Sequence, residues 1–321
     1  LSWRKFPPLV WRISVEAQES VNFRPGGEIL IPGSFDYLVA RSVDEAVALL
    51  DRHGGEAKIL AGGQSLIPLM RFRIAGPSVL VDINHINSLE YIREADSVLH
   101  IGALTREAEL DSSTLIRERY PILLETSSMV ADPVVRNWAT VGGNIAHADP
   151  ANDHPATMLA LGARVVARGP DGERVILIDD FFTDAPFETA LASNEMLIEI
   201  RIPAPVERSG GAYFKLERKV GDYAIVGAAA YITLDGSGNV NYAGIGLTNV
   251  GQVPIRARAA ERLLHGKPLD DAAIHNAADE AAAASQPTSD SRGPAGYKRA
   301  MVRTLTVRAL RKALARATGG E

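Results

Sequence analysis

Two glycine pairs constrain this chain more than any other feature of its sequence. Gly62-Gly63 lies within residues 61–66, and Gly142-Gly143 lies within residues 140–144. In each stretch an apolar run stops at the glycines and hydroxyl or amide side chains follow, a composition that lets backbone N–H groups approach an anion closely. One such pair is also typical of an ordinary turn. Two loops of the same kind favour a ligand with two linked phosphates.

Other phosphate-binding signatures are missing from the sequence. It contains no G-x-x-x-x-G-K-[ST] motif, and no G-x-G-x-x-G motif between a strand and a helix. Neither a P-loop nor a Rossmann dinucleotide site is therefore indicated. A dinucleotide would have to bind through the paired Gly-Gly loops on a mixed α+β scaffold.

Composition limits the chemistry that the chain can perform by itself. With 321 residues, 23% charged and 46% apolar, it is typical of a globular protein with two or three subdomains. The absence of cysteine excludes disulfides, thiolate nucleophiles and iron–sulfur ligation within this polypeptide. A metal redox centre would have to belong to another chain. The net charge of −5 gives no reason to expect a nucleic acid partner.

The first half of the chain predicts a two-lobed α/β unit. Residues 1–28 lack sustained periodicity and are interpreted as an irregular extension. Ser42 and Glu45 form a capping-box pattern that opens a helix, and residues 57–60 predict a strand that runs into the first loop. Strands 78–83 and 97–101 and two helical runs, from Thr105 and Pro121, follow. The predicted lobes are residues 29–84 and 85–205.

The second half predicts a hairpin and then a separate domain. Residues 164–168 and 174–178 alternate around a Gly-Pro-Asp-Gly turn, strand 196–202 follows, and prolines mark a boundary near residue 205. Beyond it, strands 212–216, 225–234 and 240–247 predict a small antiparallel sheet. Helices are expected at 256–264, 270–284 and 294–317. The fold class is α+β, with residues 206–321 as a C-terminal sheet-plus-helix domain.

Asp153 supports two interpretations. It precedes an apolar helix predicted at residues 156–161, where an aspartate commonly caps the first turn. It also follows the second loop, where a carboxylate can accept hydrogen bonds from sugar or polyol hydroxyls of a nucleotide. His147 and His154 lack the neighbours of a catalytic arrangement and stay unassigned. His85 and His100 lack the clustered ligands of a metal site.

The final predicted helix is strongly basic. It carries seven basic residues, with no acidic residue between the first and the last of them. Such a run is typical of a solvated helix face, and a partner subunit or an anionic surface is the alternative. The seven are Lys298, Arg299, Arg303, Arg308, Arg311, Lys312 and Arg316.

Together these motifs resemble the FAD-binding medium subunit of molybdenum hydroxylases. The resemblance rests on residues 61–68, on residues 140–156 and on the Arg-Lys-Val-Gly-Asp-Tyr-Ala segment at 218–224. Residues 245–250 and 289–294 are most similar to the aerobic carbon monoxide dehydrogenase branch. The likeness covers residues 31–317. It implies two lobes that hold FAD between them, followed by a C-terminal domain.

The resemblance also implies roles for individual residues. The two loops would take the FAD pyrophosphate, Asp153 would bind FAD hydroxyls, and Leu197, Lys215 and Tyr223 would lie at the isoalloxazine with Val130 as an apolar wall. The Tyr223 ring can shield a flavin face and the Lys215 ammonium can stabilise charge on the reduced flavin, although a core tyrosine and an exposed strand lysine are the plain alternatives. The implied FAD-binding residues are Ala61, Gly62, Gly63, Gln64, Ser65, Leu66, Val130, Thr140, Val141, Gly142, Gly143, Asn144, Asp153, Leu197, Lys215 and Tyr223.

One residue departs from the family pattern. The family commonly has histidine where this chain has Gln64. Glutamine keeps hydrogen-bonding capacity but cannot become cationic, so phosphate binding through the backbone should survive without an imidazole. A related branch, the hydroxybenzoyl-CoA reductases, carries an extra iron–sulfur cluster in this subunit. The lack of cysteine argues against that branch.

The expected function is therefore electron relay without catalytic residues in this chain. A large subunit would hold a molybdenum cofactor, a small subunit would hold two [2Fe-2S] clusters, and FAD here would pass electrons to an external acceptor, with quinone favoured and oxygen or a nicotinamide as alternatives. We expect a dimer of heterotrimers. The alternatives are a self-sufficient flavin reductase of a related FAD fold, a medium subunit that serves an aldehyde or N-heterocycle substrate, and a non-redox nucleotide-binding scaffold.

The cellular location follows from two further sequence observations. No apolar run approaches the about 20 residues needed to span a bilayer. The first residues lack the basic start and apolar centre of a signal peptide. The expectation is a cytoplasmic protein, with peripheral contact with the inner membrane face as an extension of it.

Overall fold

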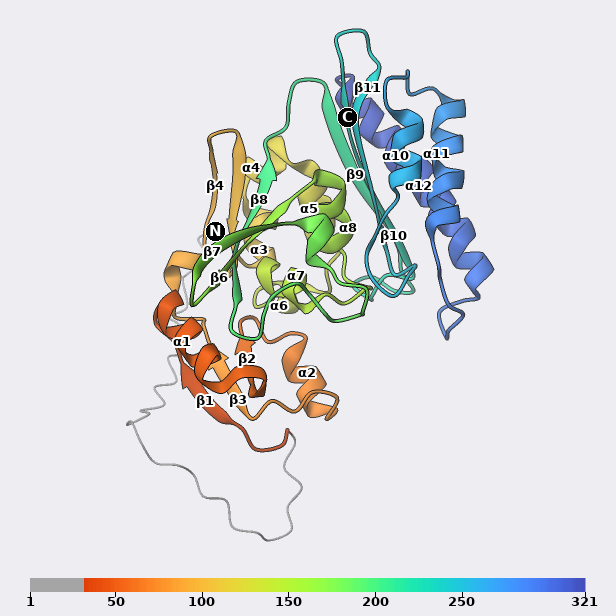
Figure 1. The fold of residues 1–321 in the computed structure, drawn as a ribbon. Coiled ribbons are helices and arrows are strands. Elements are labelled where there is room, and N and C mark those ends of the chain that lie inside the picture. The colour runs from red at the N-terminus through yellow and green to blue at the C-terminus, as the bar shows by residue number, and fades with distance from the viewer. Residues whose placement is uncertain (1–31, 321) are drawn as a thin grey trace, which may run out of the picture.

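Three sheets follow one another along the chain in the computed structural model, which describes residues 32–320 (Figure 1). The irregular extension predicted for residues 1–28 lies outside the described residues. The first sheet has three strands, the second five and the third four, and helices pack against each. The α+β class is therefore confirmed, whereas the domain boundaries at residues 84 and 205 stay predictions.

The N-terminal lobe is a three-stranded parallel sheet with strand order β1-β3-β2. Parallel strands end at the same edge of a sheet, so the segments that follow β2 and β3 emerge side by side. The first glycine pair follows β2 and Asn84 follows β3. The elements of this lobe are β1 (Asp36–Val39), α1 (Val43–His53), a 3-10 turn (Gly54–Glu56), β2 (Ala57–Leu60), α2 (Leu66–Arg71) and β3 (Val79–Asp82).

Only half of the predicted capping box of α1 forms. The Ser42 hydroxyl accepts the backbone N–H of Glu45 at 3.1 Å. The Glu45 carboxylate accepts the backbone N–H of Arg41 at 2.8 Å instead of that of Ser42. The helix still begins where the sequence predicts, because the serine cap alone satisfies one of the first-turn donors.

The central lobe is an antiparallel sheet with strand order β4-β5-β8-β6-β7. The predicted hairpin is confirmed as β6 and β7, while β4 was not predicted and three short helices replace two predicted helical runs. The elements are a 3-10 turn (Asn87–Leu89), β4 (Ile92–Ala95), β5 (Val98–Gly102), α3 (Glu107–Ser112), α4 (Thr114–Arg119), α5 (Pro121–Ser128), α6 (Pro133–Arg136), α7 (Val141–His147), α8 (His154–Leu161), β6 (Arg164–Gly169), β7 (Gly172–Leu177), α9 (Ile178–Phe181) and β8 (Met196–Pro203).

The second glycine pair is not a loop, contrary to the prediction. Gly142 and Gly143 form part of the first turn of α7. The Thr140 side chain accepts the backbone N–H of Gly143 at 3.1 Å and so caps this helix. The prediction of a loop was wrong because a threonine two residues before a glycine pair is typical of a turn as well as of a helix start.

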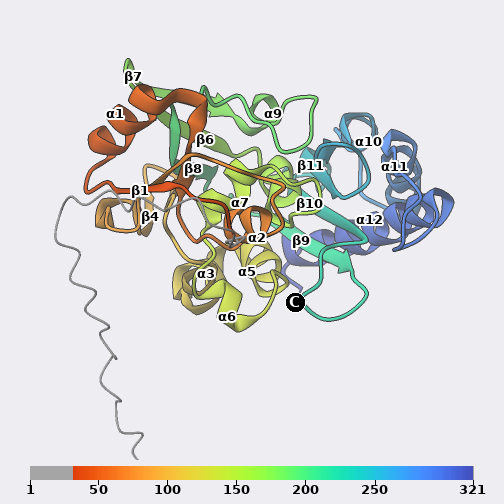
Figure 2. The same ribbon diagram turned by 90° about the horizontal axis from the view of Figure 1, so that it is seen from below.

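The C-terminal sheet has strand order β12-β11-β10-β9, with helices along its outer face (Figure 2). The predicted pairing of β10 with β11 is confirmed. The elements are β9 (Ser209–Leu216), β10 (Val226–Leu234), β11 (Val240–Thr248), β12 (Ile255–Arg256), α10 (Arg258–Leu264), α11 (Asp271–Ala284) and α12 (Ala295–Ala317).

The basic residues of α12 are largely paired within the chain. Helix α12 packs along β9 and β10, and its neighbours supply the counter-charges. Arg303 and Arg311 pair with acidic residues of α11, and Lys312 and Arg316 both reach Glu125 of α5. Lys298 is 2% exposed. The solvated-face interpretation therefore holds only for part of the helix.

Two glycines in β11 bring the central lobe and the C-terminal sheet together. A Cβ atom on Gly244 or Gly246 would lie 1.9 Å from the carbonyl oxygen of Ala160 or Ala156 in α8. Every residue of α8 is buried, and the helix packs on β10 and β11 as well as on the central lobe. Small residues on both sides thus fix the position of α8 and of the Asp153-His154 pair at its start.

No helix within residues 32–320 is both long and apolar enough to cross a membrane.

We expect Gly246→Val to disrupt this contact. The added side chain meets backbone atoms that cannot rotate away, and such overpacking costs about 2 kcal/mol of unfolding free energy. The midpoint of chemical denaturation should fall accordingly. Gly236→Ala is the matched control, because no atom lies within 4 Å of the Cβ it would add. Equal stability of the two variants would contradict this account of the α8 contact.

Candidate functional site

The two predicted glycine motifs lie in direct contact. A Cβ atom on Gly62 would lie 2.2 Å from the carbonyl oxygen of Trp138 and 2.9 Å from the Cα of Ala139. Only glycine allows the two backbones to approach this closely. The segment that leads into Thr140 therefore rests on the first loop, and motifs that are nearly 80 residues apart in the sequence form one surface.

A pair of side chains holds the two motifs in this arrangement. The Asn84 amide donates to the carbonyl oxygen of Ala61 at 2.9 Å. The Arg106 guanidinium donates to the Asn84 side-chain oxygen at 2.8 Å and to the carbonyl oxygen of Trp138 at 2.5 Å. Sequence reasoning missed both residues. The position of Asn84 after a strand parallel to β2 was the one available signal.

The first loop presents a row of unengaged backbone donors. Within the described residues, the N–H groups of residues 62–66 donate no hydrogen bond to the protein. Gly63 has a φ of 71°, which favours glycine, and the exposed Gln64 side chain donates to the carbonyl oxygen of Gly62 at 3.0 Å. The amide of Gln64 thus stabilises the turn from within. Consecutive N–H groups before a helix are a typical site for an anion.

The second motif uses its backbone donors internally, which corrects the expectation that both loops offer free N–H groups. Val141 donates to Thr105, Gly142 to Ala103, and both Gly143 and Asn144 to Thr140. Its glycines serve packing: a Cβ on Gly142 would lie 2.6 Å from a backbone atom of Ala103.

One group of the second motif remains open to a ligand, and it is not Gly143. Outside its own helix, a Cβ on Gly143 would lie 2.6 Å from the Thr140 hydroxyl oxygen that caps α7. The Asn144 side-chain oxygen is buried without a hydrogen-bond partner among residues 32–320. A buried acceptor without a partner costs free energy, so it favours a donor from outside the chain.

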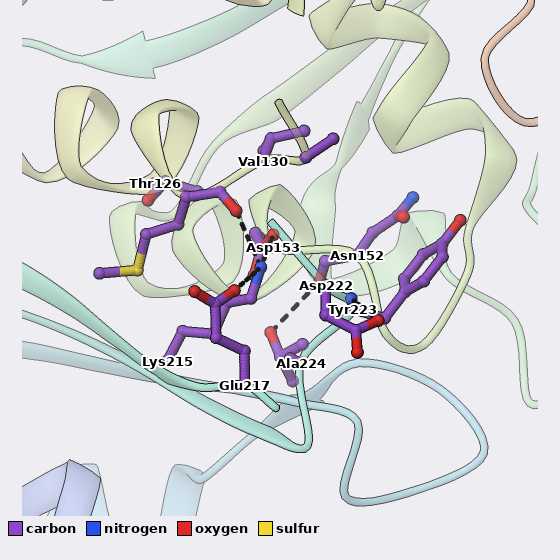
Figure 3. A network of polar contacts seen from close by, with 12 residues as sticks. Thr126, Val130, Asn152, Asp153, Lys215, Glu217, Asp222, Tyr223 and Ala224 are labelled. Carbon is purple, nitrogen blue, oxygen red and sulfur yellow. Dashed lines mark hydrogen bonds and ion pairs between the residues drawn. The ribbon is translucent and has the colours of Figure 1, made fainter. Parts of the chain in front are cut away.

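Asp153 begins α8 as predicted, but its side chain does not cap the helix. It is 5% exposed and accepts a hydrogen bond from the Tyr213 hydroxyl at 2.5 Å. It also accepts one from the Lys215 ammonium at 3.0 Å (Figure 3). Burial raises the pKa of Asp153, and the Lys215 ammonium and the Tyr213 hydroxyl oppose that rise. Burial and the Asp153 charge raise the pKa of Tyr213 well above its usual value. The Asp153 carboxylate therefore holds the Tyr213 and Lys215 side chains of β9 beside the site.

Lys215 is not the exposed strand lysine of the plain alternative. Its side chain is 1% exposed. The ammonium donates to the carbonyl oxygen of Met129 at 2.8 Å and forms ion pairs with Asp153 at 3.0 Å and Glu217 at 3.3 Å. Two carboxylates compensate its charge, as burial of an ammonium requires. Lys215 also fixes the backbone next to Val130, which is 9% exposed.

The other two predicted flavin contacts differ in exposure. Tyr223 is 45% exposed in the segment between β9 and β10, so the core-tyrosine alternative is wrong. Leu197 is 5% exposed and belongs to the core of the central lobe with Val141 and Ile145. The structure thus brings Val130, Asp153, Lys215 and Tyr223 to one region (Figure 3). The position of Leu197 beside a flavin stays a prediction.

A buried ion pair that the sequence did not reveal lies behind Asp153. His154 and Glu107 are both 0% exposed, and their side chains meet at 2.7 Å. Burial lowers the pKa of His154, but the Glu107 carboxylate raises it more, so that its pKa lies above the usual value. One further atom of each side chain has no partner within residues 32–320. This pair holds the start of α8 against α3.

Two further histidines, His100 and His147, fit structural roles. His100 contacts the Glu199 carboxylate at 3.1 Å on the sheet, and the His147 ring packs near Phe187. Among residues 32–320, no group of three or more histidine, cysteine, aspartate or glutamate side chains is placed to hold a metal ion.

Comparison with known families accounts for this architecture. Residues 33–205 match the FAD binding domain in molybdopterin dehydrogenase. The chain belongs to this family. Residues 211–313 match the CO dehydrogenase flavoprotein C-terminal domain. The family resemblance seen in the sequence is therefore confirmed.

Individual relatives match this chain over nearly their whole length. The medium chain of carbon monoxide dehydrogenase from Hydrogenophaga pseudoflava is 46% identical over 89% of this chain and 99% of its own. The alpha subunit of the 6-hydroxypseudooxynicotine dehydrogenase complex from Paenarthrobacter nicotinovorans is 42% identical over 89% and 96%. A solved carbon monoxide dehydrogenase from Hydrogenophaga pseudoflava that lacks the Mo-pyranopterin moiety superposes with a TM-score of 0.86, at 47% identity over 89% and 99%.

The residues present fit the FAD of this family. Five neighbouring N–H donors in residues 62–66 suit a diphosphate, and the orphaned Asn144 oxygen suits a donor group of the same ligand. These relatives are named as a medium chain of carbon monoxide dehydrogenase and as a subunit of a dehydrogenase complex, so both are parts of multi-subunit proteins.

We expect Glu107→Gln to destabilise the protein strongly. Removal of one charge from a buried ion pair typically costs about 3 kcal/mol, because the other charge loses its compensation. Since the folded pKa of His154 is raised, the contribution of the pair is fully present below the unfolded histidine pKa and is lost as pH rises through the folded pKa. The difference in unfolding free energy between wild type and variant should therefore shrink in alkaline buffer. Glu118→Gln is the control, because Glu118 is exposed. Equal stability of the two variants at neutral pH would contradict the stabilising role of the Glu107–His154 ion pair.

Proposed function

We propose that this chain is the FAD-carrying electron-transfer subunit of a molybdenum hydroxylase complex of the carbon monoxide dehydrogenase type. When bound, FAD supplies the redox carrier between the iron–sulfur clusters of a small subunit and an external acceptor. The chain itself binds and orients FAD and breaks no substrate bond.

The observation that carries the proposal is the row of free N–H donors beside the second motif. Residues 62–66 would bind the pyrophosphate through their backbone, which agrees with the tolerance for Gln64 in place of histidine. From the second motif, Asn144 would contribute one acceptor, and Gly143 would leave space for the Thr140 hydroxyl that caps α7. Thr140, Val141 and Gly142 would support the ligand through α7.

Asp153, Lys215, Val130 and Tyr223 would act at the flavin side of the site. Asp153 would bind FAD hydroxyls only if the ligand shares its carboxylate with Tyr213 and Lys215, which already donate to it. The charge of Lys215 is compensated, so its influence on the flavin would pass through hydrogen bonds and through the position of Val130. Leu197 would act from the core behind the ring.

The substrate of the complex is proposed from the relatives alone. Carbon monoxide is favoured because the relatives named for it show the highest identities given above. The 42% identity to a subunit named for 6-hydroxypseudooxynicotine keeps an N-heterocyclic substrate as the second candidate.

We further propose quinone as the acceptor, a dimer of heterotrimers as the assembly, and a cytoplasmic location with peripheral contact with the inner membrane face.

The proposal is tested by co-expression of this chain with candidate large and small subunits. We expect one complex that contains flavin, iron and molybdenum, with a flavin spectrum bleached by carbon monoxide. Bleaching by an N-heterocycle instead would assign the second candidate. Turnover by this chain alone, without partner subunits, would favour the stand-alone flavin reductase, and a colourless chain would favour a non-redox scaffold.

The same preparation separates binding from folding. Gly143→Trp adds a large side chain to the second motif and displaces the Thr140 hydroxyl that caps α7, so FAD content should fall to near zero while the C-terminal domain stays folded. Gly55→Trp is the matched control, because no atom lies within 4 Å of its Cβ position. Normal flavin content in Gly143→Trp would contradict the assignment of this motif to the site.

A further inference from the structure

Tyr223 lies in an exposed segment that the two flanking strands hold only at its ends. Residues 217–225 connect β9 to β10, and Val220 at its tip is 94% exposed. Within the segment, Gly221 has a φ of 79°, and a Cβ there would lie 2.4 Å from the carbonyl oxygen of Ala131. The segment therefore rests beside Val130, at the flavin side of the proposed site.

Arg292 reaches this segment from a different part of the chain. Its guanidinium donates to the carbonyl oxygens of Tyr223 at 2.9 Å and Ala224 at 3.3 Å, and to the Asp222 carboxylate at 3.2 Å. The guanidinium carbon also lies 5.8 Å from the centre of the Tyr223 ring, within the range of a cation–π contact. One side chain thus contacts both the backbone and the ring of the same tyrosine.

Arg292 lies in a turn that two further contacts hold in place. The backbone N–H of Arg292 donates to the Asp290 carboxylate at 2.8 Å. The other oxygen of Asp290 accepts the ammonium of Lys298 at 2.6 Å. Lys298 is 2% exposed within α12, so a buried side chain of this helix anchors the turn.

The other contacts of the segment do not fix Tyr223 in the same way. Asp222 accepts the backbone N–H of Tyr223 at 2.9 Å, but this contact lies within the segment and moves with it. The Asn249 amide donates to the carbonyl oxygen of Ala224, one residue further on. Among residues 32–320, the hydrogen bonds to the Tyr223 carbonyl oxygen come from Arg292. Figure 3 shows Asp222, Tyr223 and Ala224 next to one another in this region.

We propose that Arg292 is a positioning residue that fixes the Tyr223 ring at the flavin. It aligns the segment through two carbonyl oxygens and the Asp222 carboxylate, and it orients the ring through the cation–π contact. Lysine cannot reproduce this function fully, because an ammonium lacks the planar set of donors that a guanidinium offers. The inference rests on the proposed function, since it concerns the same FAD site.

The first test needs no flavin. Trypsin cleaves after Arg218 and Lys219, which lie in the exposed segment. In the full chain, Arg292→Met should speed cleavage at these two sites about tenfold, the change expected from the loss of hydrogen bonds to a charged group. Arg299→Met is the control, because Arg299 is exposed on α12 and makes no hydrogen bond or ion pair within residues 32–320. Unchanged cleavage in Arg292→Met, measured by mass spectrometry, would overturn the proposal.

The second test reads the flavin directly. A stacked tyrosine quenches flavin fluorescence, so Arg292→Met should retain FAD but fluoresce more strongly, and Arg292→Lys should lie between it and wild type. In a Tyr223→Leu background the Arg292 substitution should add nothing. An equal increase with and without Tyr223 would overturn the proposal. Failure of wild type to bind FAD in the assembled complex would instead refute the proposed function and leave the cleavage result intact.

Discussion

The site depends on one backbone contact, that of Gly62 with the Trp138-Ala139 peptide. No side chain larger than hydrogen fits there, and the contact makes two distant motifs into one surface. Asn84 and Arg106 stabilise it by bonding to carbonyl oxygens on either side. Within residues 32–320, the N–H groups of residues 62–66 donate no hydrogen bond to the protein, so they stay available to a ligand.

A second constraint acts from the other side of the molecule. Glycines in β11 allow α8 to pack between the central lobe and the C-terminal sheet, and α8 begins with Asp153 and His154. His154 is then buried against Glu107, and Asp153 joins Tyr213 and Lys215 of β9. The proposed flavin side of the site therefore combines residues of α8 with residues of β9, which belong to the first and second halves of the chain.

Much of this could be predicted where the signal is local. The hairpin of β6 and β7, the pairing of β10 with β11 and the strand before the first loop follow from periodicity and turn residues. The α7 helix was missed because glycine pairs disfavour helices, and only the Thr140 cap and packing against Ala103 reverse that preference. Arg106, Glu107 and Arg292 act through partners 20 or more residues away, which no local pattern reveals. The role of Asp153 was ambiguous for the same reason, because Lys215 and Tyr213, which donate to its carboxylate, are distant from it in the sequence.

Hydrogen exchange of the backbone amides tests the central claim most directly. In the FAD-free chain, the amides of residues 62–66 should exchange rapidly and those of residues 141–144 slowly, because only the second group has internal acceptors. Addition of FAD should slow exchange in residues 62–66 and leave residues 141–144 nearly unchanged. Slow exchange of residues 62–66 without FAD, or no change when FAD binds, would contradict the claim that these N–H groups hold the diphosphate.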